Sequence, residues 1–154
     1  MWNKALGFGV EIPFVELLGF ELTAFADGQS EILYAPKPEH LNSFSVTHGG
    51  ALMTLLDVSM ATAARSVTPE TGVVTIEMKT SFMQPAVPGA GPLVAKGLLM
   101  HRTATMAFTQ ATVYDADGKP CAHATGTFKY VKRLPTGARS VNGLNTGPET
   151  LSTD

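Results

Sequence analysis

Cysteine and charge are both scarce in this chain of 154 residues. The single cysteine, Cys121, excludes a framework of internal disulfides and is typical of a reducing compartment, so we expect a cytoplasmic protein. Charged residues make up only 16% of the chain and the formal net charge is −2, so no basic field exists to attract nucleic acid or a membrane surface. No paired metal-ligand spacing occurs among the histidines, which are His40, His48, His101 and His123. We therefore predict neither a metal nor a cofactor.

From the pattern we expect neither secretion nor a membrane span. Residues 1–7 contain no continuous apolar segment followed by a cleavage site. The longest apolar run, residues 49–64, is short for a membrane span and carries Asp57 near its centre. The length and the 44% hydrophobic content fit one domain with its own core. We expect this domain over residues 1–133 and a flexible tail, rich in Pro, Gly, Ser and Thr, over residues 134–154.

The pattern of apolar and turn residues predicts one long helix, a short one and about six strands. The short helix is predicted over residues 12–19 and the long one over residues 49–65. Asp-Gly pairs at residues 27–28 and 117–118 indicate hairpin turns. The predicted strands cover residues 20–25, 30–35, 73–83, 92–102, 105–115 and 120–132. This inventory predicts an α+β domain in which one antiparallel meander curls around the long helix.

Two of the predicted strands carry informative side chains. Residues 73–83 alternate with a period of two, which places Thr75 on the face of Glu77 and opposite that of Met78. Ala122, Ala124 and Gly126 leave room on one face of the last strand for a helix to lie close. The other face or an edge of the sheet remains to be covered, which favours a dimer.

Asp57 is the most unusual residue, because every other residue from Gly49 to Ala64 is apolar, small or hydroxylic. A helix that is apolar on nearly all sides is expected to be buried. A buried carboxylate must be paired, hydrogen-bonded or shifted in pKa, and such groups cluster at functional sites. A purely structural acid remains the alternative, satisfied by hydroxyl groups of Thr54, Ser59 or Thr75.

Gly49 and Gly50 lie at the start of the long helix, where backbone N–H groups lack partners and could stabilise an oxyanion. Eight positions separate Gly49 from Asp57, which is roughly 12 Å along a helix. Reacting groups must lie within about 3–3.5 Å of one another. If both groups act on one carbonyl, two antiparallel helices from two subunits must bring them together.

His48-Gly49-Gly50 followed by Leu55-Leu56-Asp57 resembles the signature of hotdog-fold acyl-CoA thioesterases, in particular the PaaI-like branch. Asn42, six residues before His48, and residues 72–86, which end in Pro-Ala, extend the resemblance, which covers roughly residues 12–132. It implies the hotdog fold, a long central helix wrapped by a curved antiparallel sheet. It also implies hydrolysis of an acyl- or aryl-CoA thioester at a dimer interface, in a homodimer that assembles into a homotetramer.

The resemblance further implies roles for individual residues. Gly49 N–H and Asn42 of one subunit would polarise the thioester carbonyl, and Asp57 of the other would act as general base or nucleophile. Thr75 would orient the water, at a position where relatives can carry a serine or a threonine. His48 would hold the start of the helix. The substrate would contact four further residues, which are Gly50, Met53, Phe82 and Arg102.

Two other functions belong to the same fold. A non-catalytic acyl-CoA sensor would generally carry a DNA-binding segment, and the sequence has neither a helix-turn-helix nor a basic region. Retention of Asp57 also argues against a pure binder. A hydratase or dehydratase would pair an acid with a histidine in a different motif, which is not found.

Overall fold

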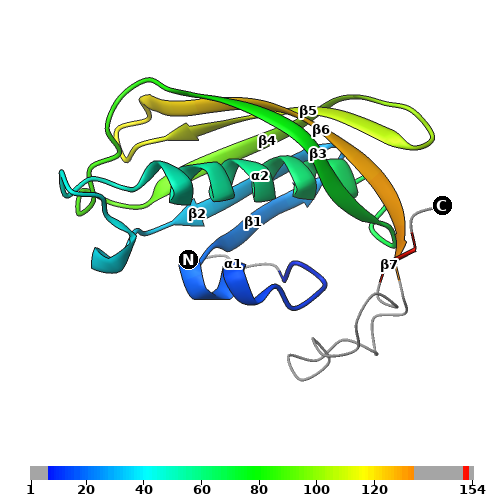
Figure 1. Cartoon of the computed structure of the whole chain (residues 1–154), viewed down its shortest axis with the longest axis horizontal. Helices are drawn as coiled ribbons and strands as arrows, with labels where there is room; N and C mark the ends of the chain where they lie inside the picture. Colours follow the sequence, from blue (N-terminus) through cyan, green and yellow to red (C-terminus); the bar gives the residue numbers. More distant parts are fainter. Residues whose placement is uncertain (1–6, 134–150, 153–154) are drawn as a thin grey trace.

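A long helix lies across the concave face of a curved antiparallel sheet in the computed structural model, which describes residues 7–133 and 151–152 (Figure 1). One long helix on a curved antiparallel sheet that does not close confirms the predicted α+β hotdog architecture. The helices are α1 Pro13–Leu18, the 3-10 helix η1 Pro38–His40 and α2 Gly49–Arg65. The strands are β1 Glu21–Ala26, β2 Gln29–Tyr34, β3 Gly72–Phe82, β4 Leu93–Arg102, β5 Met106–Tyr114, β6 Pro120–Arg133 and β7 Leu151–Ser152.

The strand order corrects the expected simple meander. The order across the sheet is β1-β2-β4-β5-β6-β3, with β7 paired to β6, so β3 joins the far edge instead of lying beside β2. The reason is α2, whose 17 residues carry the chain over the sheet before β3 begins. The free edge of β2 is then taken by β4. Strand β3 pairs only with β6 in the described chain, which leaves its outer edge open to another strand.

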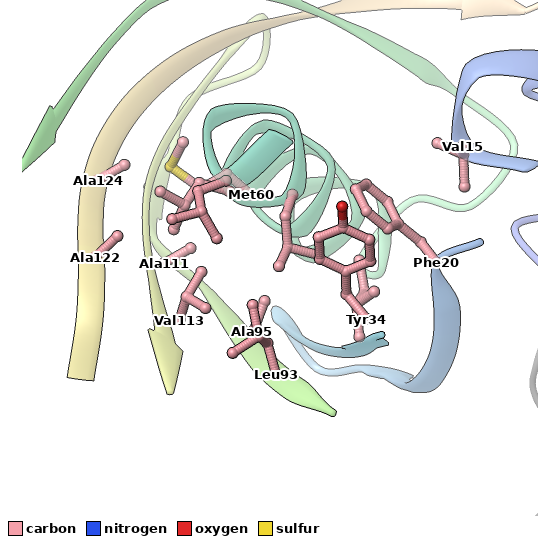
Figure 2. Packing of buried hydrophobic residues seen from close by; sticks show 14 of the residues in the cluster. Val15, Phe20, Tyr34, Met60, Leu93, Ala95, Ala111, Val113, Ala122 and Ala124 are labelled. Carbon is pink, nitrogen blue, oxygen red and sulfur yellow. The ribbon is translucent and has the colours of Figure 1, made fainter. Parts of the chain in front are cut away.

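Small residues let α2 lie close to the sheet. A Cβ atom added at Gly126 would lie 2.9 Å from Met60 Cε of the helix. A Cβ atom at Gly97 of β4 would overlap the backbone oxygen of Ser59. Figure 2 shows Met60 on the helix and the small side chains of Ala111 and Ala124 on the strands beside it. The expected close approach of the helix to β6 is therefore confirmed.

The bounds of α2 agree with the prediction, but its burial does not. The sheet covers only one side of the helix, and residues 7–133 and 151–152 supply no second sheet or helix layer on the other side. Gly50 and Met53 are exposed on the uncovered side, and Met53 retains 38% of its accessible surface. The other residues of this face are partly buried and are Thr54, Asp57, Val58 and Ala61, and Val10 and Ile12 border one groove with the last three of them. A helix face that leaves an apolar side chain such as Met53 exposed is typical of an interaction face.

The tail expected over residues 134–154 lies outside the described residues except for β7, which pairs antiparallel with Lys132 and Arg133 of β6. In the part of the chain that the structure describes, no helix is long and apolar enough to cross a membrane.

Candidate active site

Asp57 is joined to β3 by a short hydrogen bond. The Thr75 hydroxyl donates to Asp57 Oδ1 over 2.6 Å. The other two hydroxyls that the sequence offered do not reach the carboxylate. Thr54 donates instead to the Gly50 carbonyl and Ser59 to the Leu55 carbonyl, each within α2. Burial raises the pKa of Asp57 above its ordinary value, and the hydrogen bond from Thr75 opposes part of that rise.

A β-bulge aims Thr75 at the helix. The register with β6 shifts between Thr75, which faces Phe128, and Glu77, which faces Thr127, so Ile76 is the extra residue. Thr75 contacts Asp57 on the helix side, whereas Glu77 accepts a hydrogen bond from the Thr127 hydroxyl on the other face. The uninterrupted alternation predicted from sequence, with Thr75 and Glu77 on one face, is therefore wrong. A β-bulge inserts one residue, so the side chains that follow it point to the opposite face of the sheet from the one that a regular alternation predicts.

The start of α2 presents an unused backbone donor. His48 is the N-cap, and its Nδ1 accepts from the Gly50 N–H over 2.9 Å. The next two N–H groups, of Ala51 and Leu52, both donate to the His48 carbonyl. The Gly49 N–H has no acceptor within residues 7–133 and 151–152. A single N–H at the positive end of the helix dipole thus remains available to an oxygen of a ligand.

Asn42 stands in the loop before the helix with its side chain fixed at one end. Its Oδ1 accepts from the N–H groups of Phe44, over 2.9 Å, and Val46, over 3.3 Å. This turn uses the oxygen of the carboxamide, and Nδ2 is left with no acceptor among the described residues. Asn42 therefore offers a preoriented donor of the kind that an oxyanion needs.

Phe82 covers the start of α2 and joins Asn42 and Gly49 in one groove. Its ring would lie 3.4 Å from a Cβ atom added at Gly49, so the ring rests against the helix backbone there. The groove has a volume of about 400 Å³. Apart from these three residues, its lining consists of Val46, Thr47, Leu52, Met83, Gln84, Pro85 and Ala86.

Asp57 and Thr75 line a second groove, which has a volume of about 280 Å³ and shares no lining residue with the first. The two grooves therefore hold different halves of the predicted machinery. The donors Gly49 and Asn42 lie at one end of α2, and the carboxylate lies two turns further along, roughly 12 Å away. The structure thus brings the predicted residues together in two groups and does not combine them within one chain.

The remaining predicted residues lie outside both grooves. Gly50 and Met53 lie on the uncovered face of α2, and His48 is exposed at its start. Arg102 stacks over the ring of Tyr130 at 4.4 Å and lines neither groove. Within residues 7–133 and 151–152, no three His, Cys, Asp or Glu side chains come together in a way that could hold a metal ion.

A buried pair that sequence reasoning missed supports the loop before α2. The Tyr34 hydroxyl lies 2.8 Å from His40 Nδ1, which also accepts from the Lys37 N–H over 3.2 Å. The His40 carbonyl in turn accepts from the His48 N–H over 2.9 Å. The tyrosine partner lies in strand β2, six positions before His40, and neither residue alone gives a sequence signal of this contact. The pair anchors the loop that carries Asn42 to the core.

The comparisons with known proteins agree with this arrangement. A model of the thioesterase superfamily matches residues 44–122. A Saccharolobus solfataricus protein, provisionally named an esterase, is 30% identical over 112 residues, covering 73% of this chain and 78% of that protein. A conserved protein of Pseudomonas aeruginosa has a similar structure, with a TM-score of 0.74 and 28% identity over 79% of this chain and 96% of that one.

A mutant of the phenylacetic acid degradation protein PaaI from Thermus thermophilus also aligns, with a TM-score of 0.68 and 27% identity over 77% of this chain and 98% of that one. The fold and the polar residues around α2 define the class of hotdog-fold thioesterases. With the family model matching 44–122, the chain belongs to the thioesterase superfamily.

Proposed function

We propose that the protein is an acyl-CoA thioesterase whose active site is assembled from two copies of the chain. The observation that carries this proposal is that the predicted oxyanion donor and the predicted base lie at separate places along α2. The Gly49 N–H and the Asp57 carboxylate each lie in a groove of their own, roughly 12 Å apart on one helix. Neither groove alone holds both a donor for the carbonyl oxygen and a base for water.

A second copy supplies the missing half if two α2 helices pack antiparallel through their uncovered faces. In a two-fold arrangement each residue contact occurs twice, so one dimer gains two equivalent sites. Each site then combines Gly49 and Asn42 of one subunit with Asp57 and Thr75 of the other. The open edge of β3 supports the proposal, because two such edges can pair across the same axis. A homotetramer of two such dimers stays an expectation from the family resemblance.

In this arrangement the thioester carbonyl accepts hydrogen bonds from Gly49 N–H and Asn42 Nδ2, which stabilise the negative charge that develops on its oxygen. The Asp57 carboxylate removes a proton from water, and the water oxygen forms a bond to the carbonyl carbon. When the tetrahedral intermediate collapses, the C–S bond breaks and the thiolate of CoA takes up the proton. The products are the free acid and CoA.

The environment of Asp57 suits a general base. A base works best when its pKa lies near the working pH, and burial moves the pKa of Asp57 upward in that direction. The Thr75 hydroxyl donates a hydrogen bond to Asp57 Oδ1, so the lone pairs of its oxygen can accept a hydrogen bond from the attacking water. Activity should accordingly fall as the pH drops through the raised pKa of Asp57.

The test is steady-state hydrolysis of a panel of CoA esters by the wild type and Asp57→Asn, which keeps the shape of the side chain. We expect a loss of kcat on the order of 10²-fold or more, as for removal of a general base. Leu17→Ala, a change at an exposed residue of α1, serves as the control and should keep full activity. Equal rates for wild type and Asp57→Asn, or no turnover of any ester, would contradict the proposal.

A further inference from the structure

The groove beside Asp57 is closed on one side by the N-terminal segment of the chain. Val10 and Ile12, which precede α1, line it together with residues of α2, β3 and β6. Four of the side chains opposite them are apolar, which are Val58, Ala61, Val73 and Phe128, and the polar ones are Asp57, Thr62, Arg65 and Thr75. The carboxylate therefore borders a small space whose far wall, Val10 and Ile12, is apolar and comes from a part of the sequence outside the thioesterase-family match, which begins at residue 44.

The structure holds this segment in place through Arg65, a buried residue at the end of α2. Its guanidinium donates to the carbonyl of Phe8 over 3.2 Å and to the carbonyl of Thr71 over 3.3 Å. Phe8 and Ile12 also pack against the core. Gly9 lies between them with φ of 78°, a conformation that glycine adopts without strain and that turns the segment toward the helix. The wall is thus fixed by both polar and apolar contacts.

We propose that Val10 and Ile12 set the size of the acyl group that the enzyme accepts, and that this group is compact and apolar. The inference rests on the proposed function, because it places the acyl group in the groove that adjoins Asp57. With a volume of about 280 Å³, this groove is smaller than the one that holds Gly49. An acyl chain that extends past the carboxylate meets the side chains of Val10 and Ile12 and stops there.

The expected size of the effect follows from the apolar nature of the wall. One methylene group in a hydrophobic pocket changes kcat/KM by roughly 10- to 200-fold. Ile12→Ala removes several carbon atoms from the wall, so the ratio of kcat/KM for a longer ester to that for a shorter one should rise about 10-fold or more. Ile12→Phe fills the same space and should lower that ratio by a similar factor.

The experiment measures kcat/KM for a straight-chain saturated acyl-CoA series with the wild type, Ile12→Ala, Ile12→Phe and Val10→Ala. Phe14→Ala is the matched control, because Phe14 is close in sequence but 55% exposed and outside the groove. We expect the preferred chain length to increase in both alanine variants at residues 10 and 12, to decrease in Ile12→Phe and to stay unchanged in Phe14→Ala. A general loss of stability cannot move the preference in opposite directions.

The failure of this inference differs from the failure of the proposed function. A wild type that hydrolyses the series, together with variants at residues 10 and 12 that keep the wild-type preference, would overturn the role of the wall alone. A wild type that hydrolyses none of the esters would refute the proposed function and the inference with it. Thermal melts of each variant identify any that fails to fold. If Ile12→Ala fails to fold, Val10→Ala replaces it in the test.

Discussion

Replacing Gly49 by proline tests the oxyanion donor with little disturbance to the fold. Gly49 is the first residue of α2, and its N–H has no acceptor among the described residues. Proline is favoured at this position of a helix, because the N–H that it lacks is unpaired there anyway. The residue before a proline must be extended, and His48 already has φ of −61° and ψ of 137°. Gly49→Pro therefore removes one donor and leaves the backbone path intact.

The expected loss follows from what an oxyanion donor contributes. Removal of one such donor costs about 10²- to 10³-fold in kcat, or about 2.7–4 kcal/mol. Gly49→Ala is the matched control. Its Cβ meets the Phe82 ring at the same 3.4 Å, but it keeps the N–H. The difference between the two variants isolates the donor from the effect of displacing Phe82.

The assay is kcat and KM on the best CoA ester, with a thermal melt of each variant. We expect Gly49→Pro to lose about 10²-fold in kcat relative to Gly49→Ala, with similar melting temperatures. Equal kcat values in the two variants, with both folded, would refute the assignment of the Gly49 N–H as an oxyanion donor.

Three further predictions concern Thr75, Asp57 and Gly97. Thr75→Val should lower kcat about ten- to hundredfold, because a hydrogen bond to a charged group contributes about 1.5–3 kcal/mol. Thr75→Ser keeps the hydroxyl and should have a kcat near that of the wild type. Equal kcat values in the Val and Ser variants would exclude a role for the hydroxyl. Asp57→Asn should unfold at a higher temperature than wild type at neutral pH, with the difference vanishing in acid. The raised pKa means that the native state prefers the protonated acid and loses stability as the pH rises through that pKa, so a pH-independent difference would argue against this origin. Gly97→Ala should lose roughly 1–3 kcal/mol of unfolding free energy in denaturant titrations, because its Cβ would overlap the Ser59 carbonyl oxygen. An unchanged free energy of unfolding would mean that α2 can move away from β4.

The elements that depend on local sequence could be predicted closely. The long helix has the predicted bounds, because apolar, small and hydroxylic residues, interrupted only by Asp57, run from a histidine cap to Arg65. The hairpin between β1 and β2 also follows from sequence. Asp27 and Gly28 have φ of 54° and 79°, which is the left-handed geometry that an Asp-Gly pair favours in a tight turn.

Features that depend on distant contacts could not be predicted from the pattern. The position of β3 at the sheet edge depends on where α2 delivers the chain, which the strand pattern does not contain. The bulge at Ile76 leaves no mark in the alternation, yet it decides that Thr75 faces Asp57. The sequence pattern therefore identified Thr75 as a possible partner of Asp57 only among three hydroxyls, and the structure selects it.

The candidate site also has one part that local sequence predicts and one part that depends on distant contacts. The family-like residues Gly49, Asn42 and Asp57 could be found by their spacing, because that spacing is local. The wall of the second groove could not, because the segment that carries Val10 and Ile12 is held there by a hydrogen bond from Arg65, distant in sequence, to the Phe8 carbonyl. An ordinary apolar residue near the N-terminus carries no signal of such a role.

The two-subunit active site is the central claim, and mixing two inactive variants tests it most directly. Gly49→Pro lacks the donor and Asp57→Asn lacks the base, so a mixed dimer contains one site with both groups intact and one with neither. Random exchange of subunits should restore about a quarter of wild-type activity from two preparations that are each nearly inactive. A mixture that forms mixed dimers, verified with two affinity tags, but remains as inactive as its components would contradict the shared site.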